Sequence, residues 1–215
     1  MRIEPAPRGS SCSALLDDMS GVEGSCSRLY LGHVGTLSLT NHETLPAFLG
    51  NTQEIVARGL HVVGLFTYEL GARIHSIAAR SDVKPLAQML IFEHCQKIGE
   101  EEVTSWLRGQ SFSSIAGVAN VRASITERQF GDAIRSVKDY IAAGDTYQVN
   151  FTFRVDFDAY GEPADLYSRL RQRQRVPYGA LITLPDGQAV LSLSPELFVR
   201  HTAGEAVGAC DVLRA

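Results

Sequence analysis

The chain has 215 residues, of which 45% are hydrophobic and 20% charged, a composition that excludes an intrinsically disordered protein. The length fits one large domain or two small ones. A net charge of −4 gives no reason to expect nucleic acid or an anionic membrane surface as a partner.

The remaining bulk signals exclude several classes of site. The four cysteines are scattered without CxxC spacing, and residues 1–11 lack the apolar core of a signal peptide, so we expect reduced thiols in a cytoplasmic protein. No apolar run approaches the length of a transmembrane helix. HxH, HxxxH, GxGxxG, GxxxxGK[ST] and GxSxG are all missing, which argues against a histidine metal site, a bound dinucleotide, a P-loop and a nucleophile elbow.

In the first half of the chain, apolar runs and helical spacing alternate. They predict this order of elements: strand 13–18, loop 19–27, strands within 28–39, helix 43–59, strands 61–68 and 87–94, helix 100–108 and strand 118–123. The polar stretch 109–117 is the best candidate for a boundary between an N-terminal and a C-terminal portion.

The second half carries sharper local signals. Thr126–Gln129 fits a capping box, and the amphipathic helix that it opens is predicted to end at Gly144. Polar and apolar residues alternate over 148–153, which predicts a half-buried strand. A helix is expected over 163–173. Further along, the Pro185–Gly187 turn predicts a hairpin between strands at 179–184 and 188–193.

This order of elements favours an α+β fold with mixed or antiparallel sheets flanked by helices, rather than a doubly wound parallel sheet.

Two polar segments could carry chemistry. Glu196 follows a proline at a strand end, and a carboxyl on such a rigid element can be a general acid if its pKa is raised. The alternative is that Glu196 is an ordinary glutamate exposed to solvent at a strand end, which is the more common situation for this residue type. Tyr147, Gln148 and Asn150 could bind a polar ligand or form a merely solvated strand face. For these three residues, too, a solvated strand face is the more common situation.

Five motifs in order resemble those of one enzyme family. They are Ala14–Asp18 paired with Ser27–Tyr30, GLFTYELG at Gly64–Gly71, GDTYQVN at Gly144–Asn150, VPY at Val176–Tyr178, and SPELF at Ser194–Phe198. Together they are similar to the chorismate-utilising enzymes, component I of anthranilate synthase and of aminodeoxychorismate synthase. Asn150 and the YELG string favour the aminodeoxychorismate branch.

The resemblance implies a fold like that of anthranilate synthase component I and an activity for the full enzyme. That enzyme aminates chorismate at C4 to give 4-amino-4-deoxychorismate for 4-aminobenzoate and folate synthesis. A glutamine amidotransferase subunit would deliver the ammonia, and Mg²⁺ would bind the substrate. Glu196 would be the general acid/base, whereas the nucleophilic lysine and the metal ligands belong to later family segments.

The resemblance also implies an effector pocket for tryptophan, or a structural version of it. Carried over onto this sequence, it involves six residues: Leu16, Asp18, Ser27, Arg28, Pro177 and Tyr178. Asp18 stands where the family commonly has serine, which departs from the pattern for tryptophan binding.

The chain departs from the family after Phe198, because no lysine follows Lys138 and no PIKGT segment is present. The expected organisation is therefore an N-terminal region over 1–112 and the beginning of a chorismate-binding domain over 113–215, incomplete through truncation or a frameshift. We expect this chain to be inactive and poorly soluble alone. Two alternatives stay open: part of an anthranilate synthase component I, or a non-catalytic module that binds tryptophan or an amidotransferase.

Overall fold

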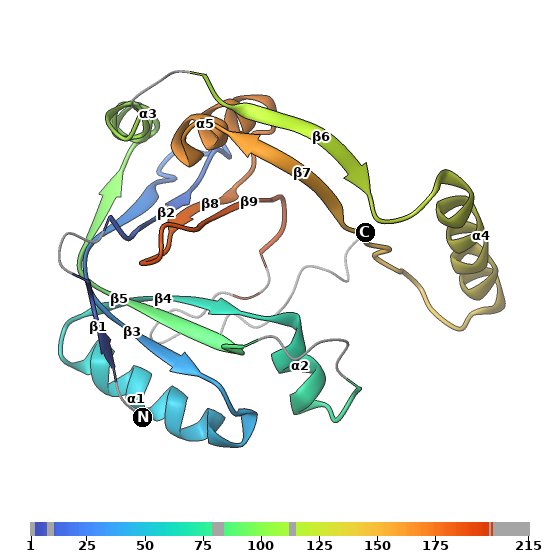
Figure 1. Cartoon of the computed structure of the whole chain (residues 1–215), viewed down its shortest axis with the longest axis horizontal. Helices are drawn as coiled ribbons and strands as arrows, with labels where there is room; N and C mark the ends of the chain where they lie inside the picture. Colours follow the sequence, from blue (N-terminus) through green and yellow to red (C-terminus); the bar gives the residue numbers. More distant parts are fainter. Residues whose placement is uncertain (1–2, 8–10, 79–83, 112–114, 198, 200–215) are drawn as a thin grey trace. The chain divides into compact units, whose positions relative to one another are not determined.

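The computed structural model describes residues 3–7, 11–78, 84–111, 115–197 and 199 (Figure 1). It divides into two compact units. The larger unit comprises Met1–Gln110 with Tyr167–Ala215, and the smaller unit comprises Ser111–Leu166. The predicted division at residue 112 concerns family regions rather than compact units and stays a prediction.

The larger unit is built on one curved antiparallel sheet (Figure 1). The strand order is β4-β5-β3-β2-β8-β9, and β1 pairs with β3 beside this path. The strands are β1 Glu4–Pro5, β2 Ser13–Asp17, β3 Ser27–Leu39, β4 His61–Phe66, β5 Ala87–Ile98, β8 Tyr178–Thr183 and β9 Ala189–Ser194. The chain therefore returns to β2 after the smaller unit, and this return places β8 against the N-terminal strand.

The two long strands, β3 and β5, are adjacent inner strands of this sheet, and their pairing is irregular at one point. Their register shifts between His33 and Gly35. At Gly35 an added Cβ would lie 2.7 Å from the backbone oxygen of Glu4, so only glycine lets β1 approach this closely.

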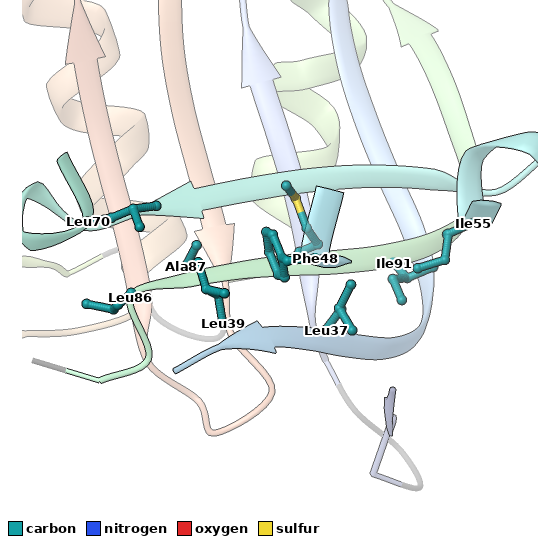
Figure 2. Packing of buried hydrophobic residues seen from close by; sticks show 9 residues of the cluster. Leu37, Leu39, Phe48, Ile55, Leu70, Leu86, Ala87 and Ile91 are labelled. Carbon is teal, nitrogen blue, oxygen red and sulfur yellow. The ribbon is translucent and has the colours of Figure 1, made fainter. Parts of the chain in front are cut away.

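Both faces of the sheet are packed. On one face Leu37, Leu39 and Ile91 meet α1 (Leu45–Ala57) and α2 (Tyr68–Ile74), which contribute Phe48, Ile55 and Leu70 (Figure 2). On the other face a cluster is formed by Cys12, Ala14, Val63, Leu90, Phe92 and Ile182. Neighbouring residues of β5 thus point to opposite cores, as the pleat of a strand requires. Each fully buried side chain of this size stabilises the fold by about 1.5–3 kcal/mol.

Two further helices belong wholly or partly to the larger unit. The helix α3, Glu100–Gly109, buries Val103 and Leu107, which are one turn apart. Its acidic first turn complements the positive end of the helix dipole. The helix α5, Pro163–Arg173, begins in the smaller unit, and its residues from Tyr167 onward belong to the larger one.

The smaller unit consists of a two-stranded antiparallel ribbon and a helix. The ribbon pairs β6 (Gly117–Ala123) with β7 (Val155–Tyr160). The helix α4, Glu127–Ala143, has the predicted capping box, with the Gln129 amide donating to the Thr126 hydroxyl at 3.2 Å. It ends at Gly144, whose φ of 81° is readily reached only without a Cβ.

The α+β class is confirmed, and every described strand pairing is antiparallel. Two predictions are wrong. The strand expected over 61–68 ends at Phe66, because the helix α2 starts at Tyr68. The alternating segment 148–153 is not a strand, since it is exposed and no described strand pairs with it.

Two features of the C-terminal sequence lie outside the described residues: Phe198 of the SPELF motif, and the segment 200–215, over which the sequence predicts a departure from the family. Among the described residues, no helix combines the length and apolar character needed to cross a membrane.

Candidate functional site

A buried polar network lies where β2, β3, β8 and α5 come together. Asp17, the last residue of β2, is 2% exposed, and Arg171 of α5 is 3% exposed. The Arg171 guanidinium donates from Nε to Oδ2 of Asp17 at 2.7 Å and from Nη2 to Oδ1 at 3.2 Å. This two-point contact is the strong, geometrically specific form of an arginine–carboxylate pair.

A tyrosine completes the pairing of this carboxylate. The Tyr167 hydroxyl, fully buried, donates to Oδ2 of Asp17 at 3.1 Å. Burial raises the pKa of Tyr167 strongly, and the adjacent Asp17 charge raises it further. The hydroxyl therefore keeps its proton and remains a donor across the physiological range.

The backbone opposite this network requires glycine. Gly179 of β8 is the ladder partner of Asp17, and a Cβ at this position would lie 2.5 Å from the Tyr167 hydroxyl. Any larger residue would collide with the hydroxyl that satisfies Asp17. Close packing against Tyr167 therefore explains why a glycine, Gly179, follows Val176–Tyr178 in the sequence.

Ser27 joins the network to the end of β2. Its hydroxyl donates to Oδ1 of Asp17 at 3.0 Å and accepts from the Asp18 backbone amide at 3.0 Å. The Met19 amide donates to the Val176 carbonyl at 3.0 Å, which ties the turn after β2 to the residue before Pro177. These contacts fix the backbone on which several predicted effector residues stand.

The six predicted effector residues stand on three neighbouring strands or directly beside them. Leu16 and Arg28 are ladder partners between β2 and β3, and Tyr178 opens β8, which pairs with β2 on its other side. Ser27 is buried, whereas Leu16, Asp18, Pro177 and Tyr178 are half-buried and Arg28 is exposed. Their role as an effector pocket stays a prediction.

Glu196 lies beyond the end of β9 and is exposed. Its backbone is held by Ser194, whose hydroxyl accepts from the Glu196 amide at 3.3 Å and donates to the Glu196 carbonyl at 3.0 Å. Ser194 is the ladder partner of Tyr178. Glu196, the predicted catalytic residue, therefore lies two residues after Ser194, which pairs with Tyr178, one of the predicted effector residues.

The Gly144–Asn150 motif belongs to the smaller unit. Tyr147 is 96% exposed, and the Gln148 side-chain amide donates to the Asn150 side-chain oxygen at 3.4 Å. These polar side chains contact one another along an exposed, irregular segment.

Two cavities lie elsewhere in the larger unit. One, of about 400 Å³, is lined by Cys12, His33 and Trp106 among others, and the second, of about 260 Å³, shares His33. Burial raises the pKa of Cys12 to about 11, so its thiol is not a nucleophile at neutral pH. Burial also lowers the pKa of His33. Within the described ranges, no three His, Cys, Asp or Glu side chains are grouped to hold a metal ion.

Sequence reasoning missed the Asp17–Tyr167–Arg171 network. The sequence places Asp17 in the motif Ala14–Asp18 and Tyr167 in the helix expected over 163–173, and it does not indicate that the two are in contact. The available signal was Arg171, which stands one turn after Tyr167 and so brings a charge onto the buried face of α5. A charge on an apolar face indicates a buried partner, but the sequence does not say which of the acidic residues it is.

Several known proteins are similar in sequence to this chain. A family model described as "chorismate binding enzyme" matches residues 27–210. Aminodeoxychorismate synthase component 1 of Escherichia coli is 31% identical over 64% of this chain and 34% of its own length. The protein of the same name from Bacillus subtilis is 27% identical over 85% of the chain and 43% of its own length.

Anthranilate synthase component 1 3 of Haloarcula marismortui is 34% identical over 42% of this chain and 18% of its own length. The chain spans about a third of the length of the enterobacterial aminodeoxychorismate synthase components that it matches. Because the family model covers most of its residues, the chain belongs to the chorismate-binding enzyme family.

Proposed function

We propose that the chain is part of an aminodeoxychorismate synthase component 1, which aminates chorismate at C4 to 4-amino-4-deoxychorismate. The observation that supports this assignment is the extent of the likeness. Relatives with that name align over 64–66% of the chain, and one over 85%, whereas the anthranilate synthase components align over 39–42%.

In this proposal Glu196 is the general acid/base for the group that leaves or enters at C4. A general acid at neutral pH needs a raised pKa, which burial of the carboxyl supplies. Glu196 is exposed here, although its backbone is held in a turn. The proposal therefore requires that further polypeptide, corresponding to the unmatched length of the relatives, cover this strand end.

The same reasoning sets the proposed partners and cofactor. The relatives are named as component 1, and a glutamine amidotransferase would be the second component that supplies ammonia. Mg²⁺ would hold the substrate carboxylate in the complete enzyme. The described residues contain no carboxylate cluster that fits this ion.

A second candidate function is the binding of an aromatic amino acid at the predicted effector residues. It is favoured by their common location on or beside β3, β2 and β8, around a backbone fixed by Ser27 and Asp17. Titration calorimetry of the 215-residue chain with tryptophan tests this directly. Saturable heat that is lost in Ser27→Ala supports it, and an absence of heat contradicts it.

The main proposal is tested by completing the chain. The 215 residues are fused to the part of the E. coli aminodeoxychorismate synthase component that follows the matched segment, and separately to the corresponding part of an anthranilate synthase component 1. We expect product from chorismate and ammonia with the first fusion only, and no turnover by the unfused chain. Activity with the anthranilate synthase fusion alone would overturn the assignment.

The role of Glu196 is tested in the active fusion. Glu196→Gln keeps the shape of the side chain but cannot transfer the proton, so kcat should fall by about 10²–10⁴. Glu101→Gln, at an exposed position of α3 away from Glu196 in the sequence, is the matched control and should leave kcat unchanged. Equal activity of the two variants would exclude Glu196 from acid/base catalysis.

A further inference from the structure

The larger of the two cavities in the larger unit has a wall without charged side chains. Ser13, His33 and Trp106 line it, and we call it the Trp106 cavity. Its volume is about 400 Å³, and the described residues around it include hydroxyl, amide and aromatic side chains but no Asp, Glu, Lys or Arg. The neighbouring cavity of about 260 Å³, by contrast, has Glu4 and Asp186 in its wall. A volume of this order, with a few polar groups in the wall, is typical of small-molecule sites.

The helix α3 provides the aromatic wall of the Trp106 cavity. Val103 and Leu107 of this helix are buried in the core, whereas Trp106 and Gln110, one turn apart, line the cavity. These four positions have the spacing of one helix face, so the core and the cavity share that face. The Trp106 side chain is half-buried, and its indole N–H has no acceptor among the described residues. A half-buried indole offers a flat surface on which a planar ring stacks, together with one free donor.

The two titratable side chains of the wall are uncharged at neutral pH. Burial raises the pKa of Cys12 to about 11, so its thiol keeps its proton. Burial also lowers the pKa of His33, whose Nε2 lies 3.1 Å from the Thr36 hydroxyl. The wall formed by the described residues therefore supplies no charge of either sign to a ligand.

Ser13 is the polar group of this wall that is most deeply buried. It is the first residue of β2, and its ladder partner in β8 is Thr183. The residue is only 8% exposed, yet its hydroxyl has no hydrogen-bond partner among the described residues. Burial of a hydroxyl without a partner costs free energy, so a ligand group that bonds to Ser13 removes that cost.

We propose that the Trp106 cavity binds a small uncharged compound that has a planar ring and an amide or hydroxyl group. The ring would stack on Trp106, and the polar group would bond to the Ser13 hydroxyl. The ligand is not chorismate, because chorismate carries two carboxylates and the wall contains no cation to pair with them. Neither Glu196 nor any of the six predicted effector residues lines the cavity, so the inference does not rest on the proposed function.

The proposal is tested with two probes of the same shape that differ in charge. Nicotinamide is a neutral planar ring with an amide, and nicotinate replaces the amide with a carboxylate. Trp106 is the single tryptophan of the chain, so its fluorescence reports contact at this cavity. We expect nicotinamide to quench the fluorescence of the 215-residue chain in a saturable manner. The dissociation constant of nicotinate should be at least tenfold higher, because its charge would be buried without a partner.

A substitution of Ser13 locates the polar contact. Ser13→Ala should raise the dissociation constant of nicotinamide about fivefold, which corresponds to the loss of one hydrogen bond. Ser105→Ala, the same change at the exposed position next to Trp106, is the matched control and should leave the constant unchanged. Without a ligand, Ser13→Ala should not lower the free energy of unfolding, because the hydroxyl has no described partner to lose. A purely structural role of Ser13 would lower it.

Three outcomes would overturn the proposal. Quenching that rises linearly and equally with both probes would show collisions only. Saturable binding that nicotinate matches, or that Ser13→Ala leaves unchanged, would show that neither charge nor Ser13 determines the site. Heat of binding in titration calorimetry without a change in Trp106 fluorescence would place the ligand elsewhere in the molecule. The activity of the fusion enzymes bears on none of these results, so this inference and the proposed function fail separately.

Discussion

The two units of this chain use the same kinds of residue with opposite results. In the larger unit, strands, helices and a returning hairpin bury two apolar clusters on the two faces of one sheet. In the smaller unit, a ribbon and an amphipathic helix leave their aromatic side chains exposed. The difference teaches that sequence pattern specifies local elements, whereas burial depends on whether a second layer is present.

The largest expected effect concerns the buried charge pair of the larger unit. Arg171→Met leaves the Asp17 carboxylate buried without its cation, so the free energy of unfolding should fall by about 3–5 kcal/mol. Urea denaturation followed by the fluorescence of Trp106, the single tryptophan, measures this in the correct unit.

A matched arginine provides the control. Arg175 pairs with Glu100 at 2.9 Å, but both side chains are about half exposed and screened by water, so Arg175→Met should cost far less stability than Arg171→Met. Similar losses in the two variants would mean that the Asp17–Arg171 pair does not hold the larger unit together.

Whether a feature could be predicted from the sequence depends on how far apart in the chain the residues that determine it lie. The capping box at Thr126 and the turn at Pro185–Gly187 lie within a few residues, and both elements formed where expected. The Asp17–Arg171 pair joins residues 154 positions apart, and nothing local to either residue identifies the other.

The errors have equally specific causes. The run HVVGLFTY is mostly apolar, which is typical of a buried strand, and this pattern does not show that α2 begins at Tyr68. The alternation over 148–153 has the period of a strand, but a strand also needs a partner to complete its hydrogen bonds. Among the described residues no strand pairs with it. The roles predicted for Glu196 and the effector residues depend on ligands, which pattern and packing do not report.

A smaller effect on the free energy of unfolding is expected from the thiol of Cys12, which lies in the apolar cluster on the second face of the sheet. Burial raises the pKa of Cys12 to about 11 in the folded protein, above the ordinary value near 8.5 of the unfolded chain. Between these values only the unfolded chain releases the proton, so stability present below pH 8.5 is lost as the pH rises toward 11. The slope contributed by one such group is at most about 1.4 kcal/mol per pH unit.

The measurement compares the native chain with Cys12→Ala. Urea denaturation at several pH values from 8 to 11 should give a flatter pH profile for the variant, whatever its stability at pH 8. Parallel profiles would show that Cys12 does not titrate differently in the folded and unfolded states. Cys95, which is only partly buried, offers a control through Cys95→Ala.

The smallest effect on stability is expected from Phe157→Ala, and its comparison with Phe92→Ala contrasts the two units most directly. Phe157 of β7 is 48% exposed in this chain, whereas Phe92 of β5 is fully buried. In the 215-residue chain alone, Phe157→Ala should change the free energy of unfolding by no more than about 0.5 kcal/mol. Phe92→Ala should cost about 3–5 kcal/mol, because it opens a cavity in a packed core. Circular dichroism during urea denaturation measures both. A large loss from Phe157→Ala would mean that the smaller unit is already covered in solution, and its apolar side chains would then be core residues like those of β5.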